Sequence, residues 1–263
     1  MAGRATRTIA HYAREAAKLA HEAAICLHDQ FIKLHSLLMK NFQTACSLLG
    51  WGDPQNGIWF IGVEEATAWT KELLESHVKN GSPQYAPESK RNWKELGYAG
   101  KSIRDYTSKV VQPLSRQYFK KSWQEYRDGI LWAEGSQIFQ ANYFPLGKPS
   151  LKDWPSQYAE LFELKSSDLK KYKELVRECR APLLQKLWKD SKPQATVCFG
   201  IYAWREFESL FQLNPDSAKW LDEDIAVYEE QKIILSPFLG QGMSDMKAKF
   251  ITEQLEKWKC SVS

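Results

Sequence analysis

The amino-acid sequence predicts an α/β fold in three layers, α/β/α, with a central, mostly parallel four-stranded sheet and an N-terminal helical extension. Three observations lead to this prediction. The chain has 263 residues, 43% of them hydrophobic, which is enough to bury a large core. Four short apolar runs alternate with segments of helical periodicity. This alternation indicates right-handed βαβ units, which build a parallel sheet with helices on both faces.

The helical extension is predicted over residues 1–49. Alanine and leucine recur at spacings of three and four along residues 8–49, which indicates one or two helices. Three glycines and a proline then follow within residues 50–57, a composition typical of turns. We therefore predict a domain boundary at this turn and assign residues 50–263 to the α/β domain.

The predicted strands are apolar runs bounded by glycine, proline or serine. They cover residues 58–62, 136–144, 195–200 and 231–235. Ligand sites in open parallel sheets form beyond the carboxyl ends of the strands. These ends lie at residues 62–65, 142–145, 200 and 236–242, so we expect the functional site there.

Polar side chains occupy several of these strand ends. Glu64 and Glu65 follow the first strand, Asn142 ends the second, and Ser236 follows the fourth. Each has an ordinary alternative, because carboxylates favour helix N-termini and Asn and Ser-Pro favour turns. It is their joint placement at one edge of the sheet that indicates chemistry.

Composition narrows the class of protein. The net charge of +4 permits a nucleic-acid partner, and the aromatic content of 13% suits stacking on bases, although it also fits a large core. The five cysteines are widely spaced and form no Cys-x-x-Cys pair, which argues against a zinc site or an iron–sulfur cluster and predicts reduced thiols. No apolar run approaches the roughly 20 residues that span a bilayer. We expect a cytoplasmic monomer with no cofactor, no metal and no membrane association.

The order of these segments resembles the uracil-DNA glycosylase superfamily. The motifs that carry the resemblance are Gly62-Val63-Glu64-Glu65-Ala66, Tyr98-Ala99-Gly100, Ala141-Asn142-Tyr143-Phe144-Pro145, Cys179-Arg180-Ala181-Pro182-Leu183, Val197-Cys198-Phe199-Gly200 and Leu235-Ser236-Pro237. Together they span roughly residues 57–258, with unmatched insertions between them. Each motif is weak alone, and their order makes the set moderately specific.

The resemblance implies a DNA glycosylase, which swings a base out of DNA and cleaves its N-glycosidic bond. It implies that Tyr98 or Phe144 stacks on the base, and that Gly62 and the Asn142 amide bind the edge of the base. It also implies that Glu64, with Glu65 as the alternative, supports the oxocarbenium-like sugar and the attacking water.

The resemblance further implies a DNA-binding rim around the pocket. Its members here are Lys101, Arg104, Lys148, Ser236, Pro237 and Gln241. Phosphate contact needs such side chains at a pocket mouth, although a solvated lysine face fits any one of them equally well.

One departure from the superfamily changes the expected chemistry. The last motif commonly holds a histidine that stabilises the leaving base, whereas every histidine here lies at or before His77. Ser236, Gln241 or a main-chain amide would have to replace it, or the leaving base needs less help. This departure, with the acid pair and the polar segment 70–97, favours a modified pyrimidine, including the glucosylated cytosine of some phage DNA, over uracil. The alternative is a catalytically silent DNA- or base-binding module on the same fold. A nucleotide-dependent enzyme is disfavoured because no glycine-rich phosphate-binding motif is present.

Overall fold

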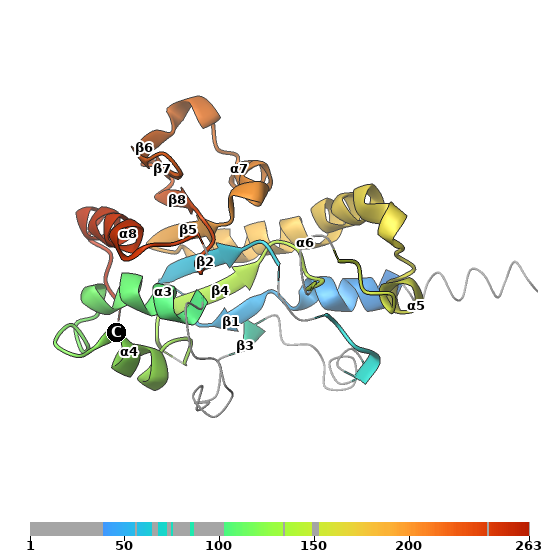
Figure 1. Cartoon of the computed structure of the whole chain (residues 1–263), viewed down its shortest axis with the longest axis horizontal. Helices are drawn as coiled ribbons and strands as arrows, with labels where there is room; N and C mark the ends of the chain where they lie inside the picture. The colour runs from blue at the N-terminus through green and yellow to red at the C-terminus, as the bar shows by residue number, and fades with distance from the viewer. Residues whose placement is uncertain are drawn as a thin grey trace, which may run out of the picture.

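A computed structural model describes residues 39–55, 57–64, 68–72, 75, 85–86, 103–133, 135–148, 153–240 and 242–262. Its strands form one sheet in the order β3-β1-β4-β2-β5-β8-β7-β6 (Figure 1). The strands are β1 (Gly50–Gly52), β2 (Ile58–Gly62), β3 (Tyr85–Ala86), β4 (Ile138–Asn142), β5 (Ala195–Phe199), β6 (Lys219–Asp222), β7 (Ile225–Tyr228) and β8 (Ile233–Ser236).

The centre of the sheet is parallel and its margins are mixed. Strands β4, β2, β5 and β8 pair in parallel, and they are the four strands that the sequence predicts. The sequence predicted a sheet of four strands. These four form only its centre, because the described sheet has eight strands. On one margin β1 pairs antiparallel with β4 and parallel with β3. On the other, β7 pairs antiparallel with both β8 and β6.

Helices and 3-10 turns connect these strands. They are α3 (Ile103–Val111), η1 (Gln112–Leu114), α4 (Trp123–Gly129), α5 (Tyr158–Phe162), η2 (Ser166–Asp168), α6 (Leu169–Ser191), η3 (Ile201–Ala203), α7 (Trp204–Phe211), η4 (Pro215–Ser217) and α8 (Asp245–Lys257). Residues 39–47 are also helical. Among the described helices, none combines the length and the apolar character needed to span a bilayer.

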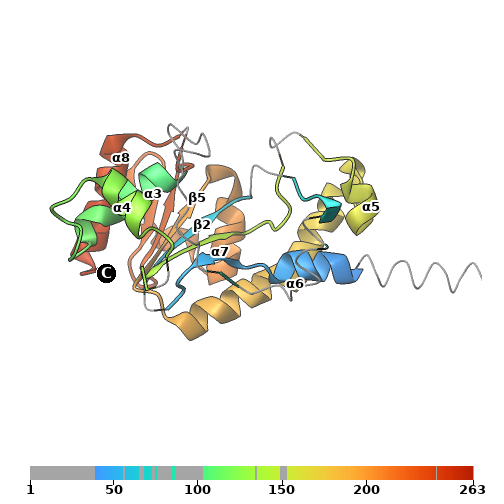
Figure 2. The ribbon, with the colours of Figure 1, turned by 90° about the horizontal axis from the view of Figure 1, so that it is seen from below.

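Two hydrophobic clusters cover opposite faces of the sheet. Alternate residues of β2 divide between them, with Ile58 and Phe60 on one face and Trp59 and Ile61 on the other. The first face packs against α3, α4 and α8, and we call it the α3 face. The second packs against residues 39–49, α5, α6 and α7, and we call it the α6 face. Figure 2 shows α3 and α8 on the side of the strands opposite to α6 and α7.

The described part of the predicted N-terminal extension belongs to the α6 face. Phe42, Ala45, Cys46 and Leu49 are almost fully buried there. Helix α6 contributes a buried stripe at four-residue spacing, made of Tyr172, Val176, Arg180 and Leu184. A charged residue within that stripe requires partners, because a buried guanidinium without hydrogen bonds is costly.

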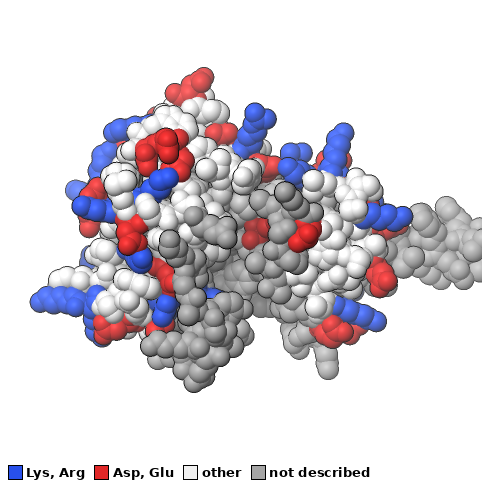
Figure 3. Space-filling model, in the orientation of Figure 1, with Lys and Arg blue, Asp and Glu red and all other residues white. Residues whose placement is uncertain are grey.

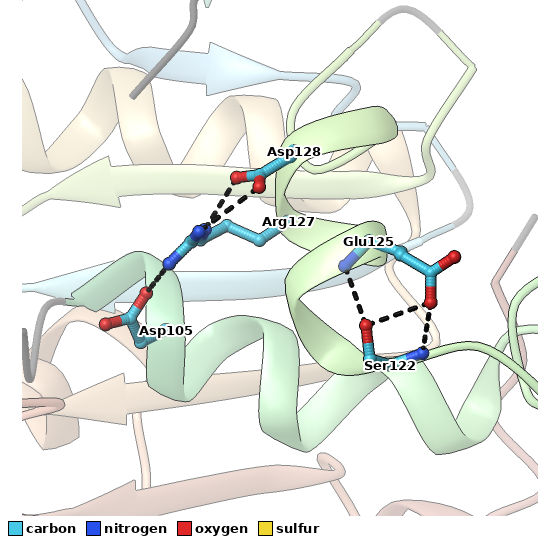
Figure 4. Close-up of polar contacts among 5 residues, drawn as sticks. All are labelled: Asp105, Ser122, Glu125, Arg127 and Asp128. Carbon is cyan, nitrogen blue, oxygen red and sulfur yellow. Dashed lines mark hydrogen bonds and ion pairs between the residues drawn. The ribbon is translucent and has the colours of Figure 1, made fainter. Parts of the chain in front are cut away.

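Polar contacts hold α4 against α3 (Figure 4). The side chain of Ser122 accepts from the main-chain N–H of Glu125, whose carboxylate accepts from the N–H of Ser122, so the two form a capping box. Arg127 Nη1 lies 2.6 Å from Asp105 Oδ1, and Arg127 Nε lies 2.8 Å from Asp128 Oδ1. The Arg127–Asp105 ion pair thereby ties α4 to the first turn of α3.

Candidate functional site

The strand order points to the sheet edge between β2 and β5 as the place for a ligand site. Chain connections run from β2 to β4 on one side and then to β5 on the other, so β2 and β5 form the topological switch point of the parallel centre. Ligands of open α/β sheets bind at such a point, outside the carboxyl ends of the strands. The residues there are Gly62 and its neighbours after β2, and Phe199 and Gly200 at the end of β5.

Gly62 and Asn142 are paired across β2 and β4 at this edge. A Cβ atom on Gly62 would lie 2.6 Å from Asn142 Oδ1 and 2.7 Å from the ring of Phe199. Only glycine therefore leaves the Asn142 amide its place beside that ring. The Asn142 side chain has no hydrogen-bond partner among the described residues. Because Asn142 is 7% exposed, its amide is a confined donor and acceptor.

The main chain of Asn142 is held by Arg180. Arg180 Nε donates to the Asn142 carbonyl at 2.8 Å, and the rest of the guanidinium donates to the carbonyls of Cys46, Leu48 and Leu49. Sequence reasoning missed this role. The signal was available, since a lone arginine on an otherwise apolar helical stripe indicates a buried, partnered charge.

Glu64 pairs with Lys148, which comes from the segment after β4. Lys148 Nζ lies 3.1 Å from Glu64 Oε2, and the two side chains are only 9% and 10% exposed. Burial raises the pKa of Glu64, and the charge and hydrogen bond of Lys148 oppose that rise. Glu64 also adds to the elevation of the Tyr172 pKa, which burial chiefly causes. Lys148, its partner, follows residues 146 and 147, which bond to the hydroxyls of Tyr172 and Tyr158, so the pair lies toward the α6 face.

The segment that carries Lys148 is tightly anchored. Its main-chain N–H groups at Tyr143 and Phe144 donate to the carbonyls of Gly62 (2.9 Å) and Val63 (2.8 Å). Side chains fix the rest: Trp69 Nε1 donates to the Pro145 carbonyl, the Tyr172 hydroxyl accepts from the Leu146 N–H, and the Tyr158 hydroxyl donates to the Gly147 carbonyl. Because the segment is bonded at each of these residues, Lys148 is held beside Glu64.

The ends of β5 and β8 are joined by the main chain. Gly200, at φ +114°, donates from its N–H to the Ser236 carbonyl at 3.0 Å. A Cβ atom at Gly200 would lie 2.4 Å from Val63 Cγ2, so a side chain there would strike the turn after β2. The Phe199 ring meets Phe238 edge to face at 5.9 Å, and Phe238 is 40% exposed. Phe238 is a second residue that sequence reasoning did not single out.

Several predicted site residues are buried in the protein interior. Ser236 is fully buried, and its hydroxyl contacts the carbonyls of Cys198 (3.4 Å) and Pro237 (3.1 Å). Pro237 is buried as well. Phe144 packs in the α6-face cluster against Tyr143 and Tyr172.

The predicted DNA-binding rim is described only in part. The guanidinium of Arg104 lies over the Trp132 ring, 5.3 Å from its centroid. The predicted residues Glu65, Tyr98, Lys101 and Gln241 lie outside the described residues. On the face shown in Figure 3, blue and red side chains are interspersed around a central grey region. The coloured part of this face therefore offers separate cations rather than one continuous basic stripe.

The two polar groups of the site approach the sheet edge from different faces. Asn142 Oδ1 and the Phe199 ring both lie within 2.7 Å of the position that a Cβ on Gly62 would take, and Phe199 belongs to the α3 face. Lys148, the partner of Glu64, directly follows Gly147, whose carbonyl accepts from the Tyr158 hydroxyl of the α6 face. The turn after β2 separates the two groups. Within the described residues, no cluster of three or more His, Cys, Asp or Glu side chains has the arrangement of a metal site. The site thus offers an amide beside an aromatic ring and a buried carboxylate–ammonium pair.

Comparison of the chain with known protein families and with curated proteins finds no match.

Proposed function

We propose that this protein is a DNA glycosylase that flips a modified or damaged pyrimidine out of DNA and hydrolyses its N-glycosidic bond, leaving an abasic site. In this proposal the fold is a three-layer α/β/α domain that acts as a cytoplasmic monomer. The observation that carries the proposal is the Asn142 amide. It is fixed through its main chain, lies beside an aromatic ring, and has no hydrogen-bond partner among the described residues.

An amide in this setting is suited to the edge of a pyrimidine. The carboxamide presents a donor and an acceptor side by side, as the Watson–Crick edge of a pyrimidine does. An amide that is already oriented loses little side-chain entropy when a ligand binds. The missing side chain at Gly62 leaves room for the Asn142 amide, and Arg180 fixes the Asn142 main chain through its carbonyl. In the bound state the base lies beside Phe199 and Asn142.

Glu64 is the proposed catalytic carboxylate. Cleavage of an N-glycosidic bond develops positive charge on the sugar, which a nearby carboxylate stabilises electrostatically. Burial disfavours the charged form of Glu64 and raises its pKa, while the charge and hydrogen bond of Lys148 favour the ionised carboxylate. The sugar lies over the turn after β2, between the base site on the α3 face and Glu64.

The departing base receives little help from the described side chains at the last strand. The Ser236 hydroxyl is directed to main-chain carbonyls and is fully buried, so we assign it no catalytic role. Loss of one donor to a developing anion typically slows a reaction by about two to three orders of magnitude. A base that leaves more readily than uracil would tolerate this loss. We propose modified pyrimidines, including glucosylated hydroxymethylcytosine of phage DNA, as the substrates, and for a cytosine derivative a group outside the described residues has to assist the departing base.

A catalytically silent module that binds DNA or a base is the second candidate. The observation that favours it is the Glu64–Lys148 contact, because a carboxylate already neutralised by a lysine 3.1 Å away offers less charge to a substrate. Under this alternative, Asn142 still binds the base and Glu64 is structural.

One experiment separates the two candidates. Single- and double-stranded oligonucleotides carrying uracil, damaged pyrimidines or glucosylated hydroxymethylcytosine are incubated with the protein and then treated with alkali. A glycosylase yields strand breaks that disappear in Glu64→Gln and in Asn142→Ala. Two control variants match these changes in burial. Glu206→Gln alters a carboxylate 10% exposed and 3.3 Å from Lys173, and Gln254→Ala alters an amide 4% exposed on α8. Both controls should cleave as the wild type does. Binding that Asn142→Ala abolishes, without breaks on any substrate, would instead establish the silent module.

A further inference from the structure

Two cysteine thiols from segments far apart in the sequence meet on the α6 face. Cys46 belongs to the helical residues 39–47, and Cys179 belongs to α6. Cys46 is buried in the α6-face cluster and Cys179 packs against the same cluster. Burial and the interaction between the two thiols raise the pKa of Cys46, and the same interaction lowers the pKa of Cys179. All four cysteines of the described residues are free thiols.

The main chain around the pair is held in place by Arg180. Its Nη1 donates to the Cys46 carbonyl at 2.9 Å and to the Leu48 carbonyl at 2.8 Å. Because Arg180 follows Cys179 directly, these bonds tie the backbone of Cys46 to the turn of α6 that carries Cys179. Cys46 and Cys179 are therefore held as neighbours on one fixed scaffold. Burial of Phe42, Ala45 and Leu49 in the same cluster adds to it.

The two thiols differ in access and in acidity. Cys46 is 1% exposed, whereas Cys179 is partly exposed. The hydrogen bond from Cys46 lowers the pKa of Cys179 to about 7, so a substantial fraction is thiolate at neutral pH. Burial raises the pKa values of Cys46 and Cys198 well above the usual range, and raises that of Cys260 to about 11. Among the described cysteines, Cys179 alone combines access with an acidic thiol.

We propose that Cys179 and Cys46 form an oxidant-sensitive dithiol site, in which a peroxide converts the two thiols into a disulfide that links residues 39–47 to α6. The Cys179 thiolate attacks one oxygen of hydrogen peroxide, the O–O bond breaks, and the leaving hydroxide takes up a proton to become water. Cys179 is then a sulfenic acid. The Cys46 sulfur attacks the Cys179 sulfur, and the hydroxyl of the sulfenic acid departs with the proton of Cys46 as a second water. Two thiols and one peroxide yield one disulfide and two waters.

The disulfide has a predictable effect on the molecule. It joins residues 133 positions apart (179 minus 46), and a cross-link that closes a long loop restricts the unfolded chain strongly. The oxidised protein is therefore more resistant to heat than the reduced protein. The dithiol site is independent of the proposed glycosylase chemistry, because neither thiol belongs to the proposed base site at the ends of β2 and β5.

The test is peptide mapping of the full-length protein after brief exposure to about equimolar hydrogen peroxide. Samples are alkylated in denaturant and digested with trypsin, which releases Cys46 within residues 41–71 and Cys179 within residues 178–180. We expect one species that joins these two peptides and weighs two hydrogens less than their sum. It should be absent after reduction and absent in Cys179→Ser. In Cys46→Ser, a second equivalent of hydrogen peroxide should oxidise Cys179 from the sulfenic to the sulfinic acid, because no second thiol intercepts the sulfenic acid.

Three outcomes would overturn the proposal. One is wild-type protein in which Cys179 becomes sulfinic acid while Cys46 remains fully alkylated. Another is a Cys179 that reacts no faster than Cys260. The third is a linked peptide that forms without any rise in the melting temperature of the oxidised protein. Because Cys179 is partly exposed, Cys179→Ser should fold, and the wild-type mapping alone decides the case if Cys46→Ser does not.

Discussion

At the scale of single residues, Gly62 shows how one missing side chain shapes the site. Replacement by alanine puts a methyl group 2.6 Å from Asn142 Oδ1 and 2.7 Å from the Phe199 ring. Gly62 and Asn142 are held opposite each other by the pairing of β2 with β4. Overpacking of this kind costs about 1–3 kcal/mol. We expect Gly62→Ala to lower the free energy of unfolding in urea by that amount and to displace the Asn142 amide, weakening binding of any base.

The control for this substitution is Gly129→Ala. That glycine lies in α4, and the atom nearest to its added Cβ would be the hydroxyl oxygen of Tyr118, at 3.2 Å. Its unfolding free energy should stay within about 1 kcal/mol of the wild type. If Gly62→Ala were as mild as Gly129→Ala, the close approach of Asn142 to Gly62 would be wrong.

Arg180 carries a second prediction at this scale. One buried guanidinium serves the carbonyls of Asn142, Cys46, Leu48 and Leu49 at 2.8 to 3.3 Å. Lysine keeps the charge but lacks the planar fork that reaches several carbonyls at once. Each buried acceptor left without a donor costs about 1–3 kcal/mol. Arg180→Lys should therefore lower the unfolding free energy by about 3 kcal/mol or more, whereas Arg177→Lys, at an exposed position one turn earlier, should change it little.

At the scale of elements, the contact between residues 39–47 and α6 can be followed by the pH dependence of Cys179. Alkylation requires the thiolate, so its rate should rise with pH through a midpoint of about 7 in the native wild type. In Cys46→Ala the hydrogen bond that lowers this pKa is gone, and burial and the Glu178 charge, which both raise it, remain. The midpoint should move above 7, toward or beyond the ordinary thiol value of about 8.5. An unchanged midpoint in this variant would show that the two thiols are not in contact.

The sequence predicted the central elements well and the marginal ones poorly. Strands β2, β4, β5 and β8 are buried along their whole length, and continuous apolar runs such as IWFIG reveal such strands directly. Strand β1 has three residues, two of them glycine, so its pairing with β4 comes from tertiary context. Strand β6 is largely exposed at the margin and carries little apolar signal. The hairpin it forms with β7 was not predicted, and its sequence signal is limited to the acidic residues of the turn between the two strands.

The site was predicted to a similar degree. Strand ends located Gly62, Glu64 and Asn142 at one edge of the sheet, because parallel strands bring their carboxyl ends together. Spacing along the chain does not report which face a side chain takes after a strand has ended. The sequence therefore did not show that Glu64 approaches Lys148 and the α6 face while Asn142 lies beside Phe199. It also did not show that the Ser236 hydroxyl is directed to main-chain carbonyls.

At the scale of the whole molecule, the predicted domain boundary between residues 49 and 50 can be tested by truncation. Phe42, Ala45, Cys46 and Leu49 are at most 2% exposed, and they fill the same cluster as Trp59 and Phe139 of the central sheet. Loss of a single buried leucine or phenylalanine side chain typically costs about 2–5 kcal/mol, and removal of residues 39–49 also takes away the carbonyl partners of Arg180. Because native domains have a total stability of about 5–15 kcal/mol, we expect a chain that begins at residue 50 to be unfolded or molten.

A chain that begins at residue 39 retains all of these contacts and serves as the matched comparison. Circular dichroism in the near ultraviolet and urea unfolding of the two truncated proteins measure the difference. Equal stability of the two would show that residues 39–49 form a separate appendage, as the sequence-based boundary holds, and that their burial contributes nothing to the core.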